Sequence, residues 1–197
     1  MADQVVLLFV GFILTTVLGG TLGYVFQRRA WTHQFNIQRA ATERSAASSA
    51  LDELSSLLDK RRYRMLRVYW QLDSGEPKEL DRRVAAYQTV LEEWNDGLNR
   101  RLALVATHFG SGLKGELEGL YETYRRAGQL LDAAVRAVRR GHSAEQLETL
   151  VGLLDGLNQR NYRFSEAGLS LIISGRVGSN MDAGQREFAP TPPPSGL

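Results

Sequence analysis

The densest group of chemically active side chains is basic. Residues 60–67 read KRRYRMLR and hold five Lys or Arg side chains. Lys60, Arg64 and Arg67 share one face of a helix, because spacings of three and four residues bring side chains together. Such a face is a candidate interaction surface for an acidic partner, an anionic lipid or a nucleic acid.

Pairing within the protein is the alternative that we favour for this basic face. If residues 60–64 lie antiparallel to residues 86–90 of a second helix, Glu92 and Glu93 come within reach of them. The whole chain has 24 Lys and Arg residues against 22 Asp and Glu residues, a net charge of +2. This bias is too small to indicate binding to nucleic acid, so we expect no nucleic acid partner.

Amide side chains form the second group. Asn158, Asn161 and Tyr162 make a polar patch on one helical stretch, and Asn95 and Asn99 lie together on another. Buried amides usually fix the register of neighbouring helices and satisfy one another's hydrogen bonds. A small-ligand pocket built from these residues is the alternative.

The remaining reactive residues match no catalytic or metal-binding pattern. The three histidines, His33, His108 and His142, stand on separate segments without ligand spacing, and the chain has no cysteine. The G-x-G-x-x-G match at residues 110–115 follows a helical stretch, whereas a dinucleotide site requires a strand there. We therefore expect no enzyme activity, metal, cofactor or small-molecule ligand.

These groups belong to a chain that begins with a long apolar segment, residues 5–26, which contains no charged residue. At about 1.5 Å per residue the segment spans about 33 Å, enough for a hydrocarbon core of about 30 Å. The long apolar run and the lack of a preceding basic residue argue against a cleaved signal peptide. Because Arg28 and Arg29 follow the segment, we expect a single-pass inner-membrane anchor with the N-terminus outside and the rest cytoplasmic.

Two further patterns mark this anchor. Gly11, Thr15, Gly19 and Gly23 recur every four residues, and a stripe of small side chains lets membrane helices pack closely. We predict a helix–helix interface there, with a second copy of the chain or another membrane protein as partner. Aromatic residues gather where the span ends, as is typical of the membrane interface. They are Tyr24, Phe26, Trp31 and Phe35.

Beyond the anchor, apolar residues recur at alternating spacings of three and four, and no stretch alternates with period two. This pattern predicts an all-α domain. Turn and capping residues divide it near Pro77, at residues 110–112 and at residues 141–146. Arg61 occupies an apolar position, and we expect it to snorkel, to stack on Trp94 or to meet Asp155. The predicted helices cover residues 41–72, 78–109, 113–140 and 143–174.

Helices of similar length with short connections predict an antiparallel, up-down-up-down four-helix bundle. A coiled-coil dimer through the first helix with a three-helix appendage is the alternative. Pairing Leu72 with Ser143 in the bundle puts Leu171 opposite Arg44. The predicted domains are an anchor at 1–26, a helical stalk at 27–40, a cytoplasmic bundle at 41–176 and a disordered, proline-rich tail at 177–197.

We therefore expect a membrane-anchored, non-enzymatic helical protein that acts as an interaction, scaffold or oligomerising component on the cytoplasmic face. The alternative is a signal-transducing or small-ligand-sensing helical module coupled to the membrane helix.

Overall fold

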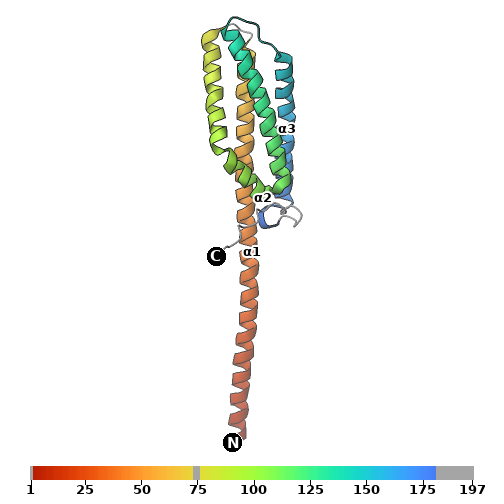
Figure 1. Cartoon of the computed structure of the whole chain (residues 1–197). Helices are drawn as coiled ribbons and strands as arrows, with labels where there is room; N and C mark the ends of the chain where they lie inside the picture. Colours follow the sequence, from red (N-terminus) through yellow and green to blue (C-terminus); the bar gives the residue numbers. More distant parts are fainter. Residues whose placement is uncertain (1, 73–75, 181–197) are drawn as a thin grey trace, which may run out of the picture. The chain divides into compact units, whose positions relative to one another are not determined.

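The computed structural model describes the backbone of residues 2–72 and 76–180. The side chains of residues 2–10, 13–15, 17–20, 22, 25 and 180 lie outside this description. Its elements are α1 (Ala2–Gln71), α2 (Pro77–Arg139), α3 (Leu147–Ile173) and a short 3₁₀ helix, η1 (Gly178–Asn180) (Figure 1). The predicted all-α class is confirmed, with no β-strand among the described residues.

The chain divides into two units, Met1–Thr42 and Glu43–Leu197, which we describe separately. Unit 1 is the N-terminal part of α1, so the predicted stalk at residues 27–40 is helical. Counting only residues that the structure describes, no helix is both long and apolar enough to cross a membrane. Most side chains of the anchor predicted at residues 5–26 lie outside that description.

Unit 2 has three α-helices, counting the C-terminal part of α1, where the sequence predicted four. The helices expected at 78–109 and 113–140 are one element, α2, because only Gly110 leaves the helical conformation, with φ 83° and ψ −178°. We call residues 77–109 the first arm of α2 and residues 111–139 its second arm.

The arms of α2 fold back on each other at Gly110. Trp94 of the first arm stacks on Tyr121 of the second, with ring centroids 6.5 Å apart. Near the far ends of the arms, Arg139 donates a hydrogen bond of 2.6 Å to Asp81. The arms are therefore antiparallel, as the green and yellow stretches of α2 in Figure 1 show.

Most of the predicted apolar positions face the core. In α1 the buried positions include Leu51, Leu54, Leu58, Met65 and Val68. Those of α3 include Leu150, Leu154, Leu157 and Phe164. Apolar residues spaced by three and four lie on one helix face, and burying that face against neighbouring helices supplies most of a helix's stability.

Glycine ends both α2 and α3 in the same way. Gly141 has φ 77° and Gly175 has φ 72°. The amides of the residues that follow, His142 and Arg176, reach back to the carbonyls of Ala137 and Leu171. This is the Schellman arrangement, which needs a left-handed residue after the helix and therefore favours glycine. The predicted helix end at Gly141 is confirmed.

The start of α3 differs from the prediction. Residues 143–146 were expected to cap this helix, but α3 begins at Leu147, and the N-cap Gln146 is left-handed with φ 59° and no side-chain cap bond. The connection therefore takes up about one turn of chain that the prediction assigned to the helix. Across the bundle, Gly175 rather than Leu171 lies against Arg44, so the α1–α3 register is shifted by about one helical turn.

The first residues of the C-terminal tail predicted at 177–197 pack against the rest of unit 2. Val177, the first residue of the expected disordered tail, is 1% exposed and belongs to the core. The backbone amide and the hydroxyl of Ser179 in η1 both donate hydrogen bonds to the Glu43 carboxylate, at 2.9 and 2.7 Å. Residues 181–197, with the proline run, lie outside the described residues.

Candidate functional site

A buried arginine lies at the centre of unit 2. Arg61 of α1 is only 2% exposed. Its guanidinium carbon is 5.2 Å from the ring centroid of Trp94 and 4.8 Å from that of Tyr124. Among the described residues its Nε and Nη1 atoms have no hydrogen-bond partner. Of the three predicted placements for Arg61, the stack on Trp94 is the one observed. The guanidinium charge is therefore stabilised by two aromatic faces rather than by a carboxylate.

Hydrogen bonds connect this arginine's surroundings to α3. The Tyr124 hydroxyl donates to the Leu58 carbonyl at 2.7 Å. The Asn161 amide nitrogen then donates to the Tyr124 hydroxyl at 2.9 Å and to the Asp59 carboxylate at 3.1 Å. The chain of contacts thus links α1, the second arm of α2 and α3. Asn161 is buried, as the polar patch predicted, and it fixes the register of α3 on its neighbours.

Burial changes the acidity of the two tyrosines near Arg61. Removal from water raises the pKa of Tyr124 well above its ordinary value, and it raises the pKa of Tyr87 in the same direction. The positive charge of Arg61 lowers both pKa values, but by less than burial raises them. Both hydroxyls therefore stay protonated at neutral pH and can donate hydrogen bonds.

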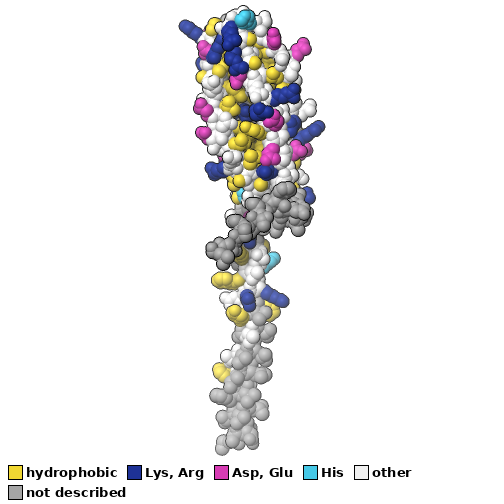
Figure 2. Space-filling view, in the orientation of Figure 1, with side chains coloured by type: hydrophobic (Ala, Val, Ile, Leu, Met, Phe, Trp, Pro, Cys, Tyr) yellow, Lys and Arg dark blue, Asp and Glu magenta, His cyan; other side chains and the backbone are white. Residues whose placement is uncertain are grey.

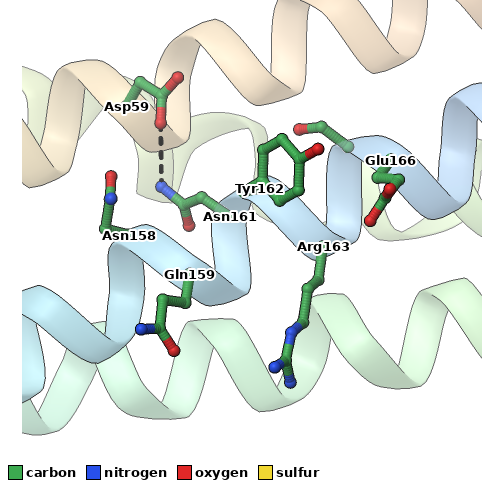
Figure 3. A pocket seen from close by; sticks show the side chains of 8 residues that line it. Asp59, Asn158, Gln159, Asn161, Tyr162, Arg163 and Glu166 are labelled. Carbon is green, nitrogen blue, oxygen red and sulfur yellow. Dashed lines mark hydrogen bonds between the residues drawn. The ribbon is translucent and has the colours of Figure 1, made fainter.

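An open polar groove of about 640 Å³ adjoins Asn161 on the surface formed by α1 and α3. Figure 3 shows Asn158, Tyr162 and Glu166 along the α3 side, with Asp59 coming from α1. The Oδ1 atom of Asn161, itself in a residue that is 4% exposed, has no hydrogen-bond partner among the described residues. The groove itself offers both acceptors, the carboxylates of Asp59 and Glu166, and a charged donor, the guanidinium of Arg163.

The structure gathers only part of the predicted polar patch. Asn158, Asn161 and Tyr162 line the groove, whereas Asn95 and Asn99 are exposed on the first arm of α2 and do not line it. The Tyr124 hydroxyl, which links helices, is a group that sequence reasoning missed. A tyrosine among leucines at helical spacing was the available signal, because a buried hydroxyl needs a hydrogen-bond partner.

The three residues of the predicted basic face have different surroundings. Lys60 forms a salt bridge with Glu93 at 2.6 Å, in agreement with the antiparallel pairing expected from the sequence. Arg67 lies over the ring of Tyr63, 5.9 Å from its centroid, and donates to its hydroxyl. Arg64 is half-buried. Whether this face also binds a partner stays a prediction.

Charges of both signs are mixed over unit 2. Figure 2 shows basic and acidic side chains interspersed on the visible face, with hydrophobic side chains between them. Elsewhere on unit 2, the α3 residues Tyr162, Leu169 and Ile173 are exposed. No group of three or more His, Cys, Asp or Glu side chains in the described part of the chain could hold a metal ion.

Unit 1 differs from unit 2 in its surface. Its large apolar side chains are exposed, among them Tyr24, Phe26, Trp31 and Phe35, each by more than 60%. Six residues on one side of the helix border an open hollow of about 480 Å³. They are Tyr24, Arg28, Arg29, Thr32, His33 and Asn36. We call these six residues the juxtamembrane face, after the membrane anchor that the sequence predicts to end at residue 26.

The small-residue stripe falls partly outside the description. The exposure of Thr15 and of Gly19 lies outside what the structure describes. A Cβ atom added to Gly11 or to Gly23 would meet no atom within 4 Å. This space is available for a neighbouring helix, and the interface stays a prediction.

No protein family, characterised protein or solved structure is detectably similar to this chain. Any functional assignment therefore depends on the residues and their geometry.

Proposed function

We propose that this protein is a membrane-anchored, non-enzymatic scaffold or oligomerising component. The anchor is residues 5–26, and unit 2 lies on the cytoplasmic face of the inner membrane. The observation that carries the proposal is the exposed aromatic surface of unit 1 beside Arg28 and Arg29. Lone apolar residues on a surface are ordinary, but several large, exposed aromatic side chains on one helix need a cover.

The order of residues favours lipid as that cover. The uncharged segment comes first, and four aromatic residues lie at its end, on both sides of Arg28 and Arg29. This is the sequence of hydrocarbon core, interface and cytoplasmic headgroup layer in a membrane protein. Self-association of the anchor through Gly11, Thr15, Gly19 and Gly23 completes the proposal, because small residues let helix backbones approach.

Unit 2 is proposed to act as the rigid cytoplasmic part of this scaffold. We regard it as an up-down-up-down four-helix bundle in which the two arms of α2 serve as the second and third helices. The stacking of Trp94 on Tyr121 and the pairing of Lys60 with Glu93 support this interpretation. Such a bundle offers long, mixed-charge helix surfaces for protein partners.

Crosslinking in native membranes tests the self-association. The double variant Gly19→Leu/Gly23→Leu should lose most of the crosslinked dimer, because the larger side chains separate the helices. Val17→Leu/Thr21→Leu, on the opposite side of the same helix, is the matched control and should crosslink like the wild type. Equal crosslinking of the two double variants would show that the stripe is not an interface.

A sensing module is the second candidate function. The open groove next to Asn161, lined by the carboxylates of Asp59 and Glu166, favours a small polar ligand that donates hydrogen bonds. Thermal unfolding of the full chain in detergent with a library of amines and polyols distinguishes the candidates. A ligand that raises the Tm of the wild type but not of Asn161→Leu would favour sensing over scaffolding.

A further inference from the structure

We propose that the juxtamembrane face binds the phosphate of an acidic phospholipid headgroup. The inference rests on the proposed membrane anchor and goes beyond it, because it assigns a lipid class to particular side chains. The juxtamembrane face brings together two guanidinium groups, a phenol, an imidazole and an amide on one helix.

Helix geometry places these donors together. Tyr24, Arg28, Thr32 and Asn36 are spaced by four residues and form one ridge, and Arg29 and His33 form the ridge beside it. The hollow between the side chains, about 480 Å³, is open to the surroundings. The Thr32 hydroxyl donates to the Arg28 carbonyl at 2.9 Å, so its proton is already used. The other five side chains carry the available donors.

Charge balance shows why the ligand is an anion. The sequence has no Asp or Glu between residues 4 and 42, so unit 1 offers no carboxylate close to Arg28 and Arg29. Arginine binds phosphate oxygens through paired hydrogen bonds, which makes it the preferred residue for phosphate recognition. Tyr24 is 64% exposed and adds a hydroxyl donor, and its aromatic ring suits the membrane interface.

Depth in the membrane identifies the source of the phosphate as a lipid. Arg28 and Arg29 follow the end of the predicted span, Phe26, by two and three residues, which is about 3–5 Å along a helix. The headgroup layer on each side of the hydrocarbon core is about 6 Å thick, so both guanidinium groups reach the phosphates. Arg39 follows Phe26 by 13 residues, about 20 Å away and more than two Debye lengths of about 8 Å.

Lipid quenching of tryptophan fluorescence measures the preference. The full chain carrying Phe26→Trp is placed in vesicles of phosphatidylcholine with a fixed fraction of phosphatidylglycerol, and either lipid carries brominated acyl chains that quench a tryptophan at the edge of the hydrocarbon core. We expect brominated phosphatidylglycerol to quench several-fold more per molecule than brominated phosphatidylcholine. A basic residue near an anionic surface contributes a factor of about five, so two arginines give a preference of up to about 25-fold.

Two matched variants make the test specific. Arg28→Gln/Arg29→Gln should reduce the preference to near one, whereas Arg39→Gln, which removes a charge on the same helix outside the headgroup layer, should keep most of it. Equal preference in the wild type and the double variant overturns the inference. An equal loss in Arg39→Gln also overturns it, because the effect would then be diffuse attraction.

Two further measurements separate the remaining explanations. Inorganic phosphate at constant ionic strength should leave the quenching ratio unchanged, and strong competition would show that the face binds soluble phosphate rather than lipid. Vesicle flotation is measured on every variant. A chain that does not float refutes both the anchor and the lipid site, while a chain that floats without a lipid preference refutes the lipid site alone.

Discussion

Replacing Arg61 with methionine should leave unit 2 as stable as the wild type or make it more stable. Arg61 is 2% exposed, and its Nε and Nη1 atoms lack hydrogen-bond partners among the described residues. Each unpaired buried donor costs about 1–3 kcal/mol, and transfer of the charge from water costs several more. The stacks on Trp94 and Tyr124 return about 2 kcal/mol each.

Setting the cost of burying Arg61 against the two stacks, we expect Arg61→Met to raise the free energy of unfolding by about 0–3 kcal/mol. Methionine fills the space between the rings without burying a charge. Arg61→Ala should instead lose about 2–4 kcal/mol, since it leaves a cavity between Trp94 and Tyr124. The contrast between these two variants separates the effect of the charge from the effect of packing.

Urea unfolding of the full chain in detergent micelles measures both effects. A Trp31→Phe/Trp70→Phe background leaves Trp94 as the fluorescent reporter of the core. With a urea dependence of about 1–3 kcal/mol per M, Arg61→Met should keep or raise the unfolding midpoint. Arg163→Met, an exposed control on α3, should change the free energy of unfolding by less than about 0.5 kcal/mol. A loss above about 2 kcal/mol for Arg61→Met would refute the reasoning.

Three further changes test the packing and the buried hydroxyls. Gly110→Ala should lose about 1–3 kcal/mol of stability by urea unfolding, because φ 83° with ψ −178° is a conformation for glycine. Gly168→Ala should lose about 1–3 kcal/mol, because its Cβ would lie 2.7 Å from Leu51 Cδ1, and Leu51→Ala in the same chain should reduce that loss. Burial raises the pKa of Tyr87 and of Tyr124. The unfolded chain therefore loses these protons at a lower pH than the folded chain. The free energy of unfolding should be constant with respect to these groups below about pH 9 and should fall above about pH 10. The free energy of unfolding, measured with urea between pH 8 and 11, should fall with a slope that Tyr87→Phe reduces by up to about 1.4 kcal/mol per pH unit.

The sequence pattern was sufficient for the helical class and for most of the core. Spacings of three and four residues identify a helix face whatever its partner is, so positions such as Leu58 and Leu154 were predictable. The bend at Gly110 and the end at Gly141 were also predictable, because glycine adopts backbone angles that other residues avoid.

The number and register of the helices depended on smaller effects. The bend at Gly110 requires only one non-helical residue, so α2 continues where a break of several residues was expected. At the start of α3, the capping pattern at residues 143–146 did not prevail, and the chain uses those residues to cross between helices. Such choices depend on small energy differences that tertiary packing decides.

The buried centre was predictable only in part. An arginine at an apolar position next to a tryptophan indicated a stack between Arg61 and Trp94. The hydrogen bonds from Asn161 to Tyr124 and Asp59 join three segments that are far apart in the sequence, so they depend on the α1–α3 register that the sequence did not determine. A shift of one turn exchanges every such partner.

The central claim is the membrane anchor with unit 2 in the cytoplasm, and cysteine accessibility in intact cells tests it most directly. The chain has no cysteine of its own, so the variants Ala2→Cys and Arg163→Cys each carry a single thiol. A membrane-impermeant maleimide should label the first variant in intact cells and the second only after lysis, with both proteins remaining in the carbonate-washed membrane pellet. Labelling of Arg163→Cys in intact cells, or release of the protein by carbonate, would contradict the account.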